Sequence, residues 1–263
     1  MFLQKKYLIS SNIHNDKLTH KISGKDQDNK IINTTVIQEE SLTIFLNNQE
    51  IVTLMCILDY PEYLAIGYLL NQNMIKNNEK IKSIDYDEDL KVIIIRTNIK
   101  TNYEKILKKK VTTSGCAQGT IFGNIYEEIL KTKIKSKIII KQEWIYEISK
   151  KINLTPSLYL TAGAVHGCVL IKKNNPLIYM EDVGRHNAVD KIAGYIFINK
   201  IKSNDKIFYT TGRLTSEMII KTVKMGIPIL ISRSGFTSWG VELALKTNLT
   251  LIGRAKGKKY IAL

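Results

Sequence analysis

The spacing of hydrophobic positions in the first hundred residues predicts a small α+β unit. Apolar residues at 42, 44 and 46 alternate with polar neighbours, which is typical of a half-buried strand. Residues 47–49 form a polar turn and 51–55 return as a second strand, so the pair predicts a hairpin. Asp59 and Pro61 then open a helix, because proline fits a first helical turn, where its missing N–H costs nothing.

The segments on either side of this hairpin and helix have simpler patterns. Residues 12–34 are polar and have no clear period, so we expect a loose segment with at most one strand. Residues 91–97 (KVIIIRT) are largely apolar, which indicates a buried strand. The pattern then changes near residue 100. We therefore expect a small α+β domain over residues 1–105 and a second domain over 106–263.

The second part of the chain alternates between strand and helix patterns. Strands are predicted at 137–140, 165–171, 177–180, 206–210, 228–232 and 249–252. Helices are predicted at 142–152, 187–198, 215–225 and 238–246. Alternation of this kind predicts a three-layer α/β sandwich, with helices covering both faces of a sheet.

Polar, glycine-containing loops follow three of these predicted strands, at 181–187, 210–213 and 232–235. Open α/β sheets bind ligands in such loops. Arg185, Arg213 and Arg233 lie in them, and the planar fork of arginine suits phosphate and carboxylate groups. Two interpretations remain open. Arg185, Arg213 and the adjacent helix N-termini bind an anion, or the loops are fastened by caps and Asp–Arg pairs.

His186 lies in the first of these loops, near Asp182 and Asp190 in the sequence. Either carboxylate could orient the imidazole ring or raise its pKa if the two groups are close in space. The pattern leaves two alternatives, a functional histidine and a structural histidine that is hydrogen-bonded near a helix start.

The three cysteines stand in two kinds of surroundings. Cys116 lies in a small, polar stretch at 111–120, where a thiol is accessible, and the lysines at 108–110 favour its ionisation. It is either a nucleophile or an incidental loop cysteine. Cys56 and Cys168 are expected in the core. The sequence contains no C-x-x-C pair and no deaminase zinc signature, and we expect no metal site.

Composition changes this picture mainly through charge. The chain has 263 residues, of which 44% are hydrophobic and 24% charged, as in globular proteins. A formal net charge of +15 suggests a nucleic-acid or anionic-membrane binder, but 34 of the 39 basic residues are lysines. An AT-rich coding sequence would produce the same bias, and the lysines would then be solvated surface.

No secretory signal or apolar stretch of membrane-spanning length is present, so a cytoplasmic location is expected.

Four segments resemble the formate dehydrogenase accessory sulfurtransferase family, the sulfur carrier proteins for the molybdenum cofactor of formate dehydrogenase. The most specific match is EDVGRHNAVDK within residues 161–191. The other matching segments are residues 39–72, residues 211–257 and the cysteine loop TTSGCAQGT at 112–120. The resemblance implies a cytidine-deaminase-like α/β fold for the second domain, without the deaminase zinc signature.

The resemblance also implies an activity, a cofactor and partners. Cys116 matches the family's persulfide carrier, which accepts sulfur from a cysteine desulfurase. The sulfur passes to the bis-molybdopterin guanine dinucleotide cofactor before its insertion into apo-formate dehydrogenase. The family's cofactor-binding stretch falls on Arg254, Ala255, Lys256, Gly257, Lys258 and Lys259. Arg185, His186 and Arg213 are expected to add to it, and a homodimer without nucleic-acid or membrane partners is expected.

The cysteine loop departs from the family in one position. Many members carry a second cysteine three residues after the first, and this chain has Gly119 there. A relay between paired cysteines in this loop is therefore excluded, whereas a single persulfide on Cys116 is compatible with the sequence. The alternative function is a chaperone that binds the molybdenum cofactor without transferring sulfur.

Overall fold

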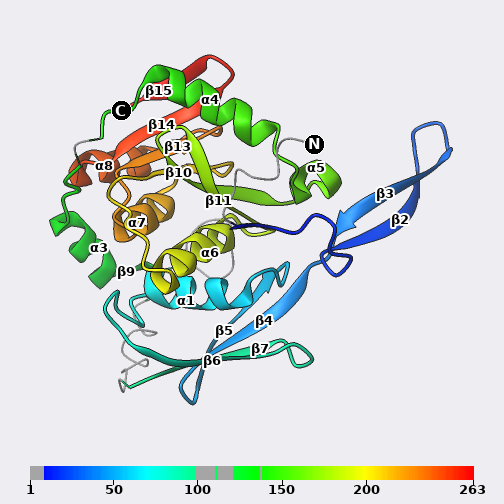
Figure 1. Cartoon of the computed structure of the whole chain (residues 1–263), viewed down its shortest axis with the longest axis horizontal. Helices are drawn as coiled ribbons and strands as arrows, with labels where there is room; N and C mark the ends of the chain where they lie inside the picture. The colour runs from blue at the N-terminus through cyan, green and yellow to red at the C-terminus, as the bar shows by residue number, and fades with distance from the viewer. Residues whose placement is uncertain (1–8, 99–109, 112–120, 137) are drawn as a thin grey trace.

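A seven-stranded mixed sheet forms the centre of the computed structural model, which describes residues 9–98, 110–111, 121–136 and 138–263 (Figure 1). The strand order is β1-β11-β10-β12-β13-β14-β15. The strands are β1 (Ile9–Ser10), β10 (His166–Lys172), β11 (Asn175–Asp182), β12 (Ile207–Thr210), β13 (Ile229–Ser232), β14 (Thr250–Lys256) and β15 (Lys259–Ala262). β12, β13 and β14 are parallel neighbours, and β10 is antiparallel to both β11 and β12.

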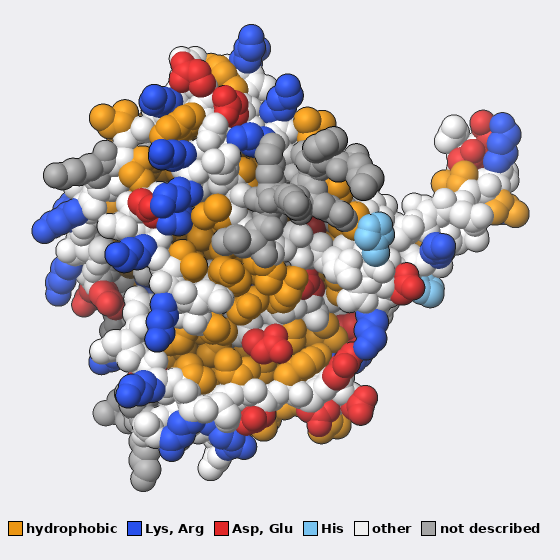
Figure 2. Space-filling model, in the orientation of Figure 1, with side chains coloured by type: hydrophobic (Ala, Val, Ile, Leu, Met, Phe, Trp, Pro, Cys, Tyr) orange, Lys and Arg blue, Asp and Glu red, His pale blue; other side chains and the backbone are white. Residues whose placement is uncertain are grey.

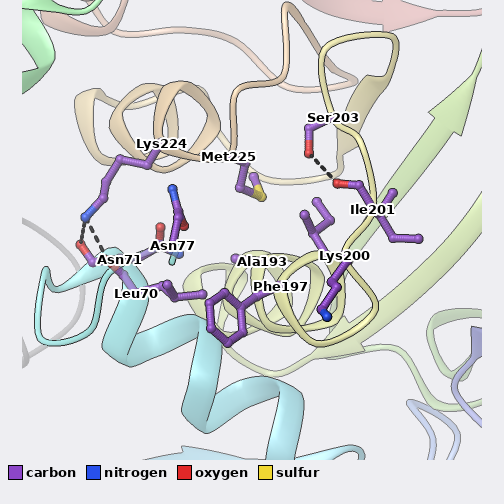
Figure 3. Close-up of a pocket in the computed structure, with 11 residues that line it drawn as sticks. Leu70, Asn71, Asn77, Ala193, Phe197, Lys200, Ile201, Ser203, Lys224 and Met225 are labelled. Carbon is purple, nitrogen blue, oxygen red and sulfur yellow. Dashed lines mark hydrogen bonds between the residues drawn. The ribbon is translucent and has the colours of Figure 1, made fainter. Parts of the chain in front are cut away.

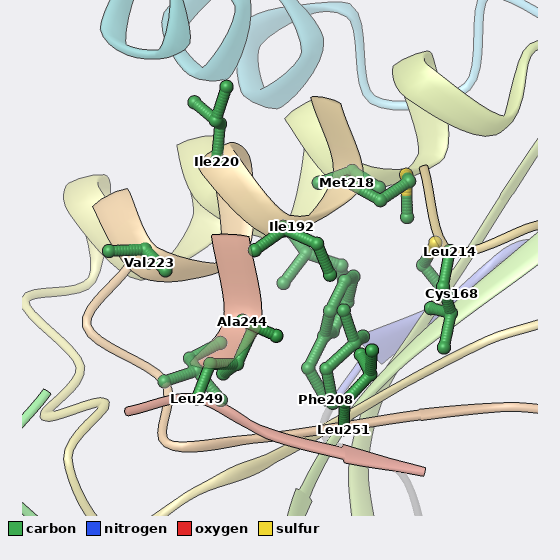
Figure 4. Packing of buried hydrophobic residues seen from close by; sticks show 14 of the residues in the cluster. Cys168, Ile192, Phe208, Leu214, Met218, Ile220, Val223, Ala244, Leu249 and Leu251 are labelled. Carbon is green, nitrogen blue, oxygen red and sulfur yellow. The ribbon is translucent and has the colours of Figure 1, made fainter. Parts of the chain in front are cut away.

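Helices cover both faces of this sheet. On one face, α4 (Gln142–Asn153) buries Ile145, Ile148 and Ile152. The other face carries α3 (Gly123–Lys131), α6 (Arg185–Ile198), α7 (Ser216–Lys224) and α8 (Ser238–Thr247). Figure 4 shows Phe208 and Leu251 of the strands packing against Ile192 of α6 in this second layer. The three-layer α/β architecture is therefore confirmed.

The N-terminal part forms a separate four-stranded sheet with the order β5-β4-β7-β6. Its strands are β4 (Glu40–Leu46), β5 (Gln49–Cys56), β6 (Ile81–Asp87) and β7 (Val92–Thr97). The predicted hairpin, the predicted helix α1 (Pro61–Asn71) and the buried strand β7 are all confirmed. One side of α1 packs on this sheet and another on α6, so α1 joins the two sheets (Figure 1).

The α1–α6 seam is the close contact of these two helices, formed by Gly67 and Asn71 of α1 and by Asp190 and Gly194 of α6, with Lys221 of α7 reaching into it. A Cβ on Gly67 would lie 1.7 Å from the Asp190 carbonyl oxygen, and a Cβ on Gly194 would lie 1.9 Å from that of Tyr63. Glycine at both positions lets the backbones approach this closely. The buried Asp190 carboxylate accepts hydrogen bonds from Lys221 Nζ at 2.8 Å and Asn71 Nδ2 at 2.6 Å.

The structure differs from the predicted secondary structure at several places. Residues 12–34 were expected to hold at most one strand, but β2 (Thr19–Lys25) and β3 (Ile31–Ile37) form a hairpin that projects from the molecule (Figure 1). Residues 138–140 are not a strand. The short helix α5 (Leu158–Ala162), and the strands β8 (Lys110–Val111) and β9 (Ile121–Phe122), were not predicted.

The division into domains at residues 105 and 106 stays a prediction. The boundary falls within 99–109, outside the described residues. β1, near the start of the chain, pairs with β11 of the large sheet rather than with the N-terminal sheet.

Charge is scattered over the face of the molecule that Figure 2 shows. Lysine and arginine side chains lie around its periphery among acidic ones, and hydrophobic side chains occupy its centre. Over the described residues, no helix is long and apolar enough to cross a bilayer.

Candidate functional site

Four strands of the large sheet end at one edge. β11, β12, β13 and β14 run in the same direction, and β10 begins at this edge with His166 opposite Asp182. The three polar loops predicted from the sequence therefore lie side by side. We call this surface the strand-end edge, formed by residues 182–186, 210–215 and 232–237 with His166 and Arg254.

Hydrogen bonds connect two loops of the strand-end edge to each other and to β14. Three of them link neighbouring loops: Ser232 Oγ to Gly212 O at 2.6 Å, Leu214 N to Gly235 O at 2.9 Å, and Arg254 N to Ser234 O at 2.7 Å. The loops after β12 and β13 and the adjoining part of β14 are thus fixed relative to one another, and their side chains are positioned on a rigid support.

Arg185, His186 and Arg213 gather around His166, as a common anion site requires. Arg185 is the first residue of α6 and is only 9% exposed. Its side chain crosses Gly212, where a Cβ would lie 3.2 Å from Arg185 Cβ and Cδ. Burial lowers the pKa of His166, and the charges of Arg185, His186 and Arg213 lower it further. Like charges are therefore concentrated here.

The partner of His186 differs from the one expected. Its Nε2 lies 3.1 Å from Glu217 Oε2, at the start of α7. Asp182 instead pairs with Lys191 at 2.8 Å, and Asp190 pairs with Lys221 in the α1–α6 seam. The two carboxylates that are close to His186 in the sequence are each paired with a lysine, so neither orients the imidazole ring.

Glu181 is a member of this region that the sequence reasoning missed. Its carboxylate accepts hydrogen bonds from the backbone N–H groups of Leu158 at 2.8 Å and Tyr159 at 3.0 Å, at the first turn of α5. Burial raises its pKa to about 6, against the effect of these hydrogen bonds. An acidic residue at the end of a buried strand was the available signal.

The predicted C-terminal cofactor stretch divides into three environments. Arg254 is exposed beside Gly235, and therefore belongs to the strand-end edge. Ala255 is buried in the core beneath α4. Lys256, Gly257, Lys258 and Lys259 are exposed at the turn between β14 and β15, where Gly257 has a positive φ of 57°. The structure brings Arg254, but not the side chain of Ala255, to the edge.

The prediction that Cys56 and Cys168 are core residues is confirmed. Both are fully buried, and Figure 4 shows Cys168 inside the cluster between the sheet and α7. Burial raises the pKa of each thiol to about 12. Cys116 and Gly119 lie outside the described residues.

Two cavities lie at the other end of α7, away from the strand-end edge. One, of about 350 Å³, is lined by the ends of α1 and α6 and by Lys224 (Figure 3). The second, of about 610 Å³, shares Leu70 and Lys224 with it. Lys224 Nζ donates hydrogen bonds to Leu70 O at 2.8 Å and Asn71 O at 3.1 Å. This lysine therefore satisfies carbonyl groups at the end of α1.

The fold and this edge define an α/β protein with a cationic loop surface at its strand ends. The chain belongs to the FdhD/NarQ family, whose model matches residues 37–262. It is 31% identical over 225 residues to the sulfur carrier protein FdhD of Wolinella succinogenes, covering 85% of this chain and 78% of that protein. It is also 31% identical over 228 residues to the sulfur carrier protein FdhD of Bacillus subtilis, covering 86% of each.

A solved structure has the same fold. It is a crystal structure of a protein assigned as a formate dehydrogenase accessory protein, from Desulfotalea psychrophila. The two chains are 26% identical and superpose with a TM-score of 0.73, over 93% of this chain and 95% of the other. The fold class predicted from the sequence is confirmed, whereas the likeness to cytidine deaminases stays a prediction.

Proposed function

We propose that this protein is a sulfur carrier and sulfurtransferase required for formate dehydrogenase activity. Cys116 accepts persulfide sulfur from a cysteine desulfurase and passes it to bis-molybdopterin guanine dinucleotide, before that cofactor enters formate dehydrogenase. Membership of the FdhD/NarQ family carries the proposal, because its curated relatives are named sulfur carrier proteins. The cofactor is the cargo of the reaction rather than a resident group.

The state of the other thiols supports Cys116 as the carrier. Sulfur transfer needs an accessible thiolate. Cys56 and Cys168 are buried and have pKa values raised to about 12, so they are poor nucleophiles at neutral pH. In the accepting step, the Cys116 thiolate attacks the terminal sulfur of the donor persulfide. The donor S–S bond breaks, the desulfurase cysteine leaves as a thiolate, and Cys116 becomes a persulfide.

The strand-end edge supports the binding of the dinucleotide cofactor. A dinucleotide presents a diphosphate, which favours arginine forks and helix N-termini. Arg185, Arg213 and Arg254 lie at this edge, and α6, α7 and α8 begin there. The exposed Lys256 ends β14, the strand that contains Arg254, Lys258 lies in the turn that follows, and Lys259 begins β15.

Intact-mass spectrometry after incubation with a cysteine desulfurase and cysteine tests the sulfur step. The wild type should gain the mass of one sulfur atom, and dithiothreitol should remove it. Cys116→Ala should gain nothing, whereas the matched variant Cys56→Ala should load like the wild type. An adduct that persists in Cys116→Ala would reject Cys116 as the carrier. A wild type that gains no sulfur would favour the cofactor chaperone, in which Gly119 reflects a lost transfer function.

A further inference from the structure

The β2–β3 hairpin, residues 19–37, projects from the molecule beside the large sheet (Figure 1). Figure 2 shows it standing clear of the rest of the chain, with hydrophobic side chains exposed on it. Two antiparallel strands alone are only marginally stable in water, and among the described residues no third strand pairs with either of them. The projecting part of the hairpin therefore contributes little to the core, and its exposed side chains require another explanation.

The two faces of the β2–β3 hairpin differ in chemistry. Ile22, Ile32 and Val36 lie on one face, because side chains alternate along each strand and cross-strand partners share a face. Ile22 is 42% exposed and Ile32 is 46% exposed. Lys21 and Lys25 lie on the other face, and neither forms an ion pair with a carboxylate among the described residues. The hairpin therefore presents exposed apolar side chains on one face and unpaired positive charge on the other.

The root of the β2–β3 hairpin is fixed beside the strand-end edge. Leu18 and Ile37 at this root belong to one hydrophobic cluster with Leu158 of α5. Val183 of the strand-end edge packs against the same cluster. The backbone N–H of Gln38 donates to Leu18 O at 2.9 Å and closes the root. A protein that binds the hairpin is therefore held next to the strand-end edge.

A cavity of about 540 Å³ lies at the same root, between the hairpin and the N-terminal sheet. Leu18 and Ile57 form part of its apolar lining. Lys17 and Glu88 also line it, and they pair with each other at 2.5 Å. A partner that binds the hairpin has room here to insert a side chain at the root.

Charge decides which kind of partner fits the hairpin. The chain has a formal net charge of +15, so a second copy would bring like charges to the unpaired Lys21 and Lys25. A protein surface with carboxylates around an apolar centre is complementary to the hairpin. A membrane surface fits less well, because an element that lies on lipid presents its apolar and basic side chains toward the same interface. The hairpin has them on opposite faces.

We propose that the β2–β3 hairpin docks the enzyme that receives the cargo, cofactor-free formate dehydrogenase, through an apolar surface bordered by carboxylates. This inference rests on the proposed function and assigns one of its partners to a surface of this chain. The acceptor enzyme is the partner that the position favours, because the cargo leaves from the strand-end edge and the hairpin root adjoins that edge. The family match begins at residue 37, so family membership assigns no role to the hairpin.

Biolayer interferometry with purified, cofactor-free formate dehydrogenase of the same organism tests the apolar face, with the full chain immobilised. The double variant Ile22→Ser, Ile32→Ser should weaken binding by about tenfold or more, because two apolar side chains no longer leave water at the interface. The matched double variant Ile139→Ser, Leu245→Ser removes two exposed apolar side chains elsewhere and should bind like the wild type.

The same measurement at two salt concentrations tests the basic face. The double variant Lys21→Glu, Lys25→Glu should slow association with the acceptor enzyme at low salt, and high salt should reduce the difference. The double variant Lys200→Glu, Lys202→Glu changes the net charge equally at exposed positions near the end of α6. It should associate like the wild type at high salt and faster than the hairpin variant at low salt.

Equal affinities of the hairpin variants and their controls would overturn the proposal, and so would a wild type that does not bind the acceptor enzyme. Hairpin variants that lose binding to cysteine desulfurase, or to phosphatidylglycerol vesicles, but keep binding to the acceptor enzyme would reject it as well. Thermal melting checks that each variant is folded. Persulfide loading of Cys116 is measured separately on the same proteins. A wild type that binds the acceptor enzyme through the hairpin but loads no sulfur would reject sulfur transfer and leave the docking assignment standing.

Discussion

Helix α6 carries two polar regions that differ in how completely their buried groups are hydrogen-bonded. At the α1–α6 seam, Asp190 is buried and fully paired with Lys221 and Asn71. In the first turn of the same helix, Arg185 and His186 each keep a buried atom without a partner. Pairing of every group is what a structural contact requires, whereas unpaired groups suit a ligand. The same helix is therefore fully paired at the seam and incompletely paired at its first turn.

Adding a methyl group to the seam should produce the largest effect. Gly67→Ala would place Cβ 1.7 Å from the Asp190 carbonyl oxygen, and that atom belongs to a backbone that cannot rotate away. We expect a loss beyond the roughly 1–3 kcal/mol of ordinary overpacking, enough to prevent folding. Gly24→Ala is the matched control, because a Cβ there meets nothing within 4 Å. Soluble yield and urea unfolding measure both, and a stable Gly67→Ala protein would contradict the close contact.

Removing one charge from each region should separate the two roles. Lys221→Met leaves the Asp190 carboxylate buried without its cation and should cost about 3–5 kcal/mol of unfolding free energy. Arg185→Gln removes a charge with an unpaired Nε and should change stability by less than about 1 kcal/mol. Urea unfolding of both variants measures the difference. Similar losses in the two variants would mean that Arg185 in the first turn of α6 is as structural as the seam.

Elements of the fold could be predicted where buried and exposed positions alternate along the chain. β4 and β5 have one buried face, and their hydrophobic positions repeat every second residue. The β2–β3 hairpin is exposed on both faces, with Ile31 76% exposed, so it leaves no such pattern. Residues 138–140 look like a strand because Ile138 and Ile140 pack on the core, although no strand pairs with them.

The candidate site was predictable in its loops but not in its contacts. Strand–loop–helix alternation places Arg185 and Arg213 at one edge, because strands of one sheet that run in the same direction end at the same edge. The partner of His186 is Glu217, which is 31 residues away, whereas the carboxylates near it in the sequence are paired with lysines. Such partners depend on packing between helices, and sequence spacing does not report it.

Glu181 offers a smaller, pH-dependent test, because its buried carboxylate caps the first turn of α5. Its pKa is raised to about 6 in the folded protein, from an ordinary value of 4.5. The folded state therefore binds more protons than the unfolded state between these values, and stability falls as pH rises from 4.5 to 6. The shift corresponds to about 2 kcal/mol.

Glu181→Gln should remove this dependence. Relative to the wild type, the variant should gain stability as pH rises from 4 to 7, as measured by urea unfolding at each pH. Glu50→Gln, at an exposed position on β5, is the control and should follow the wild type. Parallel curves for Glu181→Gln and the wild type would show that this carboxylate is not held in an unfavourable charged state.

The smallest effect is expected at the exposed turn between β14 and β15. Reversing Lys256 and Lys258 to Glu should weaken diguanosine diphosphate binding about two- to fivefold at low salt, because exposed charge pairs contribute roughly 0.2–1 kcal/mol. High salt should remove the difference. Reversing Lys21 and Lys25 on the projecting hairpin changes the net charge equally and should leave affinity unchanged. If both pairs weaken binding alike, the turn acts only through total charge, and the diphosphate is recognised by the arginines of the strand-end edge alone.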